Sequence, residues 1–175
     1  GGFKKPDGNF QFLRTVEILD VAAGTWSKGP DMLMQHDYPA FAQVGDSIFI
    51  LGGHHPDAIE GGPQTDPGFT FSERMTLLSG SSMAGSWREI PPLPIPRFAK
   101  TAAVLNRKIW VMGGVAYTGQ GLVEYGRVDI LDPVSEKWTV EEDLELPWPM
   151  AAQAASVWKG RLYCFGGFST DWINP

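Results

Sequence analysis

Short, unbroken apolar runs that end in a pair of glycines recur along the chain. They read "IFILGG" at 48–53, "IWVMGG" at 109–114 and "LYCFGG" at 162–167, and the chain itself opens on Gly1 and Gly2. Four apolar residues rich in aromatic and β-branched side chains are typical of a strand that is buried on both faces. The glycine pairs follow one another at steps of 51, 61 and 53 residues, which predicts a structural repeat of that length.

An 18-residue segment leads into each internal glycine pair, and the three copies align without a gap. They begin at His36, Arg97 and Met150. The first half of each copy is rich in small residues, and a turn pair then precedes the apolar run: Gly45-Asp46, Asn106-Arg107 or Lys159-Gly160. Such pairs favour tight hairpins, so each segment is predicted to form two antiparallel strands.

A second block, ending in tryptophan, lies between successive glycine pairs. It reads "VEILDVAAGTW" at 16–26 and "VDILDPVSEKW" at 128–138, with a looser copy, "MTLLSGSSMAGSW", at 75–87. Each repeat is therefore predicted to contain four strands: strand a (small residues), strand b (the apolar run), strand c ("VEILD" or "VDILD") and strand d (the tryptophan). No long stretch keeps a helical period free of Gly and Pro, so the predicted fold class is all-β.

These repeats resemble those of the kelch family of β-propellers. The resemblance rests on three internal glycine pairs and three spaced tryptophans: Gly52, Gly53, Gly113, Gly114, Gly166, Gly167, Trp26, Trp87 and Trp138. The family's usual tyrosine, seven places before the tryptophan, is replaced by Leu19 and Leu131. The resemblance implies a kelch-type propeller segment, in which blades stacked around an axis bury both faces of strand b and the tryptophans fill the gap between blades.

The repeat divides residues 1–175 into one propeller segment of about three blades' worth of four-stranded antiparallel sheets. Residues 1–26 supply strands c and d of a partial blade, 36–87 and 97–138 form complete blades, and 150–175 supply strands a and b of a last partial blade. Propellers contain about four to eight blades, so we expect the missing blades of the same propeller, or a second copy of the chain, as partners. An ordinary two-sheet sandwich is the alternative fold, but it lacks such phasing.

Composition narrows the possible partners. The formal net charge is −6 without any basic run, which argues against a nucleic-acid partner. No apolar stretch approaches the roughly 20 residues of a membrane span. Cys164 is the only cysteine, and no signal peptide is seen, which favours the cytoplasm, although a chain without an initiator Met has the look of a fragment. No cofactor is expected.

Long loops on a rigid scaffold are the usual place for function, and here the b–c and d–a loops are the long ones. We expect them to form one face that binds a partner, and an exposed Arg97 at its rim would suit carboxylates. The candidate partner-binding residues are His36, Asp37, His54, His55, Arg97, Tyr117 and Tyr125. His36, His54 and His55, with Asp37 and Asp57 close by in sequence, are weak candidates for metal ligands, but ordinary polar loop roles are favoured and no metal is expected.

The predicted function is therefore a protein-interaction scaffold that binds a partner protein or peptide through this loop face. Two alternatives stay open. One is a segment of a propeller enzyme, of the sialic-acid mutarotase or galactose-oxidase type that shares kelch repeats. The other is a purely architectural part of a large assembly. No catalytic residue is assigned, because Cys164 lies within a predicted buried strand and no nucleophile motif is present.

Overall fold

The computed structural model describes residues 3–4, 11–54, 68–76, 85–118 and 121–169 of the chain. Within these residues the structure is all strand and loop, without a helix, which confirms the predicted fold class. The strands are β1 (Phe3–Lys4), β2 (Gln11–Phe12), β3 (Glu17–Asp20), β4 (Thr25–Lys28), β5 (Ala40–Val44), β6 (Ser47–Gly53), β7 (Phe69–Thr76), β8 (Trp87–Ile90), β9 (Thr101–Leu105), β10 (Lys108–Met112), β11 (Val115–Thr118), β12 (Gly121–Glu124), β13 (Arg127–Asp132), β14 (Lys137–Glu145), β15 (Ala154–Trp158) and β16 (Arg161–Phe165).

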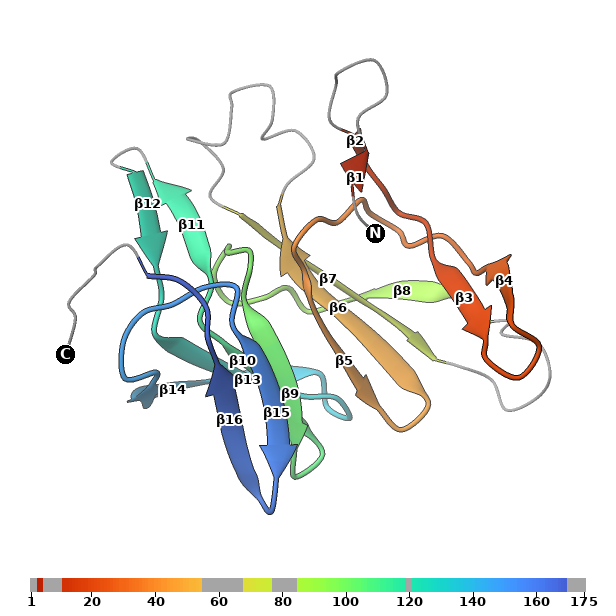
Figure 1. The fold of residues 1–175 in the computed structure, drawn as a ribbon. Coiled ribbons are helices and arrows are strands. Elements are labelled where there is room, and N and C mark those ends of the chain that lie inside the picture. The colour runs from red at the N-terminus through yellow and green to blue at the C-terminus, as the bar shows by residue number, and fades with distance from the viewer. Residues whose placement is uncertain (1–2, 5–10, 55–67, 77–84, 119–120, 170–175) are drawn as a thin grey trace.

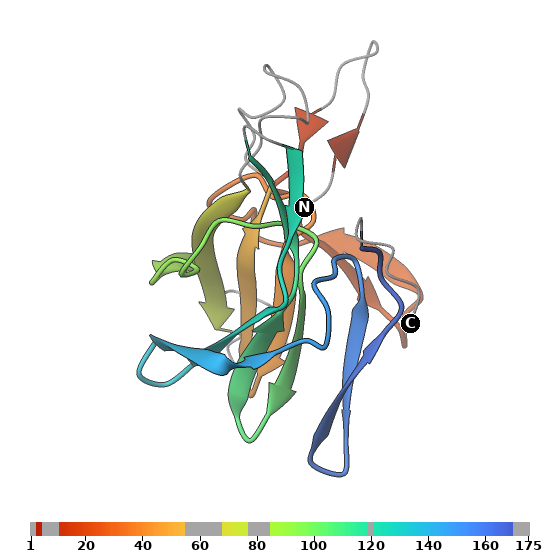
Figure 2. The same ribbon diagram turned by 90° about the vertical axis from the view of Figure 1, so that its left-hand side faces the viewer.

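Two four-stranded antiparallel meanders form the centre of the molecule. One has the order β5-β6-β7-β8 and the other the order β9-β10-β13-β14, so each runs a, b, c, d through its strands. Two-stranded sheets flank them: β3–β4, with strands c and d, on one side and β15–β16, with strands a and b, on the other. The a strands β5, β9 and β15 lie nearest to one another, as expected of blades around an axis (Figures 1 and 2).

The predicted hairpin turns between strands a and b form where the sequence placed them. Gly45, Asn106, Arg107, Lys159 and Gly160 all have left-handed φ angles, between 46° and 71°. Asn and Gly tolerate this region best, and consecutive left-handed residues give the turn twist that matches antiparallel strands.

Strand c of the first complete blade begins earlier than predicted. The sequence predicts that this strand begins at Met75, whereas β7 spans Phe69–Thr76. Met75 pairs with Trp87, as Leu131 pairs with Trp138 and Leu19 with Trp26. Met75 therefore occupies the last apolar position of the strand, not the first. Glu73 consequently shares a column with Asp129 and Glu17, so all three c strands carry an acidic residue at this position.

The b–c loops contain structure that the sequence did not predict. In the second complete blade, β11 and β12 form a hairpin directly after the glycine pair, with Val115 opposite Glu124 and Thr118 opposite Gly121. β1 and β2 pair in the same way near the N-terminus, Phe3 opposite Phe12. Both hairpins project from the same end of the molecule in Figure 1.

The glycine pairs are required by backbone angle and by space. The first glycine of each pair has a left-handed φ: +58° at Gly52, +64° at Gly113 and +60° at Gly166. A Cβ on Gly113 would lie 2.4 Å from the Met150 carbonyl oxygen and 2.4 Å from Nε2 of Gln153, both in the next blade. Glycine is therefore the residue that allows adjacent blades to approach this closely.

The main apolar core lies between the two complete blades. It is formed by Ala40, Ala42, Phe49, Leu51, Ile90, Leu93, Ile109, Val111 and Leu131. Trp87 and Trp138 each donate an indole hydrogen bond of 3.0 Å to a carbonyl of the preceding blade, Pro30 and Pro91 respectively. The prediction that tryptophans lie between blades is thus confirmed at both positions. Trp26, whose preceding blade is not part of the chain, is 67% exposed.

A series of backbone hydrogen bonds links the blades just before each strand a. Tyr38, Ala99 and Ala152 occupy equivalent positions and all have left-handed φ angles of 48°, 51° and 56°. The Ala99 N–H donates to the Tyr38 carbonyl at 3.1 Å, and the Ala152 N–H donates to the Ala99 carbonyl at 2.6 Å. The repeated backbone kink therefore brings neighbouring blades into direct contact.

Candidate interaction face

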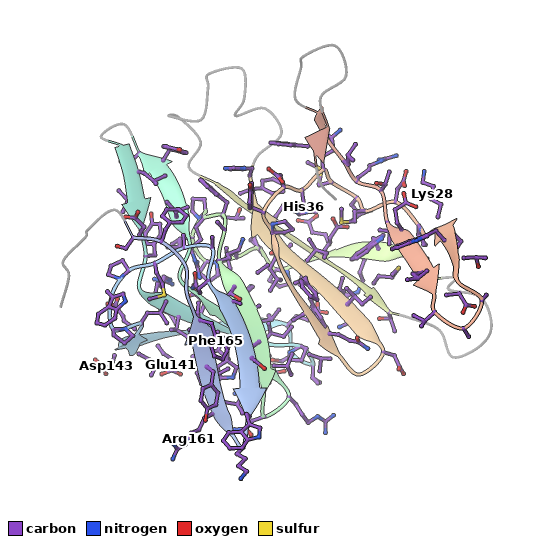
Figure 3. All side chains as sticks on the ribbon, viewed as in Figure 1. Lys28, His36, Glu141, Asp143, Arg161 and Phe165 are labelled. Atoms are coloured by element: carbon purple, nitrogen blue, oxygen red, sulfur yellow. The ribbon has the colours of Figure 1, made fainter. Side chains whose placement is uncertain are left out.

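The molecule has two ends with different character. One end carries the β1–β2 and β11–β12 hairpins and the entry points of the a strands, and we call it the loop face (Figure 1). The other end carries the tight a–b and c–d turns, and we call it the turn face. Figure 3 marks both: Arg161 lies at the β15–β16 turn, whereas His36 lies toward the loop face.

An aromatic row crosses the loop face from the first partial blade to the second complete blade. The Phe12 ring stacks on the His54 ring at 6.2 Å between centroids, and His54 packs on Phe98 at 3.8 Å. Phe98 in turn stacks on Tyr117 at 5.9 Å. The structure thus joins two predicted site residues, His54 and Tyr117, through a phenylalanine that the sequence analysis did not single out.

Asp37 forms hydrogen bonds with His54 of this row, and the Tyr38 ring packs against His54 from the side. The Asp37 carboxylate lies 3.3 Å from Nδ1 of His54, and its carbonyl accepts the His54 N–H at 2.7 Å. The Tyr38 ring meets His54 edge-on at 5.5 Å and is 53% exposed. Tyr38 sits at its left-handed position because the chain must turn there into strand a. It is the most exposed ring of the group, and no charge or motif in the sequence marks it.

His36 is buried, and the expectation that it lies at the surface of a loop is wrong. Its side chain is fully buried and its two ring nitrogens face oxygen atoms: Nε2 lies 2.9 Å from Glu73 and Nδ1 lies 2.9 Å from the Gly52 carbonyl. Glu73 also accepts the backbone N–H of Leu33 at 2.8 Å. These contacts tie strands a, b and c of one blade together.

Arg97 is also buried, so the predicted exposed guanidinium at the rim is wrong. Its Nη2 donates to Asp129 at 2.7 Å with both side chains fully buried, and its Nε donates to the Gly113 carbonyl at 2.8 Å. Asp129 is additionally held by Arg127. Burial lowers the pKa of Arg97, while the neighbouring Asp129 charge acts in the opposite direction. The position is a structural equivalent of His36 in the next blade.

Lys100 is a buried charge that sequence reasoning missed. Its Nζ donates to the Arg97 carbonyl at 3.0 Å, and the side chain runs past Gly52 of the preceding blade. Burial lowers the pKa of Lys100 well below its usual range, and the charge of Arg97 lowers it further. The signal in the sequence was the alignment of Lys100 with Gln153, whose Nε2 likewise reaches a preceding blade, at the Met112 carbonyl, 3.0 Å away.

The other predicted site residues contribute less. Tyr125 is half-buried and its backbone N–H donates to the Gly114 carbonyl. His55 lies outside the described residues.

Among the residues that the structure describes, no three His, Cys, Asp or Glu side chains gather as a metal site would require, and no helix is long and apolar enough to cross a membrane. Burial raises the pKa of the Cys164 thiol.

The turn face also has a hollow, between the two complete blades. It encloses about 440 Å³, and its lining includes Phe49, Arg74 and Arg107. Arg74 is held by the Pro133 carbonyl and by Glu136, which also pairs with Arg88. Phe49 and Arg74 stand where the next blade has the pair Trp110 and Ile130. It is a second place where a ligand could enter.

Comparison with known proteins agrees with the repeat. No protein-family model matches the chain. The chain is 26% identical over 175 residues to Kelch repeat and BTB domain-containing protein 12 of Danio rerio, covering 95% of the chain and 27% of that protein. It is 32% identical over 172 residues to Kelch repeat protein M-T8 of Myxoma virus, covering 91% of the chain and 28% of that protein.

The fold has a solved counterpart. The structure of YjhT superposes with a TM-score of 0.70 at 16% identity, covering 90% of this chain and 46% of that one. The chain therefore spans little more than a quarter of these two curated relatives and about half of the solved structure. The repeat pattern, the four-stranded meanders and the inter-blade tryptophans agree with these relatives: the chain has the fold of a kelch-type β-propeller segment, and the curated proteins that it resembles are kelch-repeat proteins.

Proposed function

We propose that this chain is part of a protein-interaction scaffold, and that its loop face binds a partner protein or peptide. The observation that carries the proposal is the aromatic row of Phe12, His54, Phe98 and Tyr117, with the half-exposed Tyr38 ring beside it. Phe12 and Phe98 are buried and form the support, and Tyr38 is the exposed ring that they help to hold. An exposed aromatic side chain on a rigid support is typical of an interaction hot spot, because it offers large contact area at little entropic cost.

The buried pairs below this face supply the rigidity. His36 with Glu73, and Arg97 with Asp129, lock the strand entries from which Tyr38 and Phe98 project. We therefore assign direct contact to Tyr38, Asp37, His54 and Tyr117, and a supporting role to His36 and Arg97. Partner contact by His55 and Tyr125 stays a prediction. The repeat itself fits the proposal, since kelch propellers commonly serve as interaction modules.

The test is a peptide selection with the loop face altered. A random peptide phage library is selected on the immobilised chain, and the enriched peptides are measured by calorimetry against wild type and two variants. We expect Tyr38→Ala to weaken binding by about 1–3 kcal/mol without changing the melting temperature, because an exposed ring contributes contact and not core. Arg161→Ala, at a turn on the opposite face, is the matched control and should bind as wild type.

Two results would contradict the proposal. One is a set of peptides that bind Tyr38→Ala as tightly as wild type. The other is binding that is lost on Arg107→Ala instead, because Arg107 lines the hollow on the turn face and is remote from the aromatic row. A purely architectural role predicts that no enriched peptide depends on Tyr38.

A further inference from the structure

Each complete blade contains one fully buried pair of a nitrogen donor and an acid. The donor opens strand a, and the acid lies in strand c: His36 with Glu73 at 2.9 Å, and Arg97 with Asp129 at 2.7 Å. All four side chains are fully buried. The pair spans strand b, so it forms only when the a–b hairpin and the c–d hairpin of one blade are joined.

Such a pair makes the joining of the two hairpins selective. A buried carboxylate that loses its partner keeps the full cost of leaving water, whereas a matched pair recovers it. An acid in strand c therefore requires a donor in strand a of the same blade. Conversely, an apolar residue in strand a requires that strand c carry no acid at this position.

The two half-blades of the chain carry one member of the pair each, and the members do not match. In β3, Leu19 pairs with Trp26 as Leu131 does with Trp138, which places Glu17 in the column of Asp129 and Glu73. Glu17 is exposed, and among the described strands β3 pairs only with β4. Before β15, the residue equivalent to His36 and Arg97 is Met150, which cannot donate a hydrogen bond.

We propose that the open edge of β3 is built for an a–b hairpin whose first strand is opened by Arg or His, and not for the β15–β16 hairpin of a second copy. Joining β16 of one copy to β3 of another would make a six-blade ring, with Tyr163 opposite Ile18 as Trp110 is opposite Ile130. That ring would bury Glu17 against Met150. The inference rests on the fold alone and is independent of the loop-face proposal.

The backbone around Met150 replaces only part of the missing donor: the Met34 N–H lies 3.5 Å from Glu73, and its equivalent before Met150, Trp148, keeps an N–H. In the first complete blade, Glu73 also accepts the N–H of Leu33, three residues before His36. The residue three places before Met150 is Pro147, which has no N–H. In the second complete blade, Asp129 is also held by Arg127, and the equivalent residue beside Glu17 is Thr15. Self-closure would therefore leave the Glu17 carboxylate without a charged partner.

The experiment uses the 175-residue chain and changes one member of the Glu17–Met150 pair at a time, so that the two residues become compatible. Met150→Arg supplies a donor for Glu17, and Glu17→Leu supplies an apolar residue for Met150. Each single variant should convert the chain to a closed dimer in sedimentation velocity. A ring contains two such junctions, so at about tenfold per junction the dimer affinity should rise about a hundredfold over wild type. Circular dichroism and thermal melting verify that each variant is folded.

The double variant decides the outcome. Combining Met150→Arg with Glu17→Leu again buries an unpaired charge, so its dimer affinity should fall back toward wild type. Val134→Arg, at a turn position 85% exposed, and Glu141→Leu, on the exposed part of β14, make the same charge changes elsewhere and should leave association unchanged (Figure 3 labels Glu141). The proposal is overturned if wild type closes as tightly as the single variants, or if the double variant closes as tightly as they do.

Discussion

Gly113→Ala should destabilise the chain far more than the same change at Gly166, although the two glycines are equivalent in the repeat. Both have left-handed φ angles, +64° and +60°, so alanine at either position carries the same backbone strain of about 1–2 kcal/mol. A Cβ at Gly113 would also lie 2.4 Å from the Met150 carbonyl oxygen, whereas a Cβ at Gly166 would meet nothing within 4 Å. Backbone cannot yield cheaply, so overpacking should add about 1–3 kcal/mol at Gly113 alone.

Thermal unfolding followed by tryptophan fluorescence would measure both variants. For a chain of this size, about 1 kcal/mol lowers the melting temperature by roughly 2–4 °C. At mid-range values of about 1.5 and about 3.5 kcal/mol, we therefore expect a loss of about 5 °C for Gly166→Ala and about 10 °C for Gly113→Ala. Equal losses would refute the packing account, because the difference comes only from the blade that stands against Gly113 and is missing beside Gly166.

Two further predictions concern the buried charges. Arg97→Ala should cost about 3–5 kcal/mol in urea unfolding, because it leaves the fully buried Asp129 carboxylate without its main partner; a loss below about 1 kcal/mol would refute the burial. Lys100→Met should stabilise the chain near neutral pH, because the depressed pKa of Lys100 means that the folded state holds its proton less tightly than the unfolded state. Wild-type stability should then rise toward about pH 10, where the unfolded lysine also loses its proton, so the advantage of Lys100→Met should shrink there; an advantage that grows with pH would refute the assignment.

The sequence predicted those parts of the fold that local chemistry determines. An apolar run closed by two glycines marks strand b, because a strand covered on both faces needs apolar side chains on both and the neighbouring blade leaves no room for a Cβ at Gly113. The turn at Asn106-Arg107 is equally local, since left-handed angles favour particular residues. The tryptophans could be placed between blades because the resemblance to kelch repeats implies that position for them.

The site was predicted less well, because its contacts join residues that are distant in sequence. Arg97 looked like a surface residue after a proline-rich loop, and its partner Asp129 lies 32 positions later within an apolar strand. The recurring acid of strand c was the signal, but the sequence alignment placed Met75 opposite Val128, three positions from its structural equivalent Leu131, and this hid Glu73 from that column. Tyr38 could not be singled out at all, since its exposure follows from a backbone kink and not from its side chain.

Two sets of contacts in this chain act at different levels of propeller assembly: one joins the hairpins within a blade, and the other stacks neighbouring blades. Which hairpins join into one blade depends on the buried pair across strand b, as Arg97 and Asp129 show. Which blades stack depends on a different column: Lys100 fills the space at Gly52, and Gln153 the space at Gly113. The two columns are in contact, because Lys100 donates to the Arg97 carbonyl, whereas the side-chain change Met150→Arg leaves Gln153 and Gly113 unaltered. A sequence of similar repeats can thus specify a unique order of assembly, since each junction accepts only one combination of donor, acid and filling side chain.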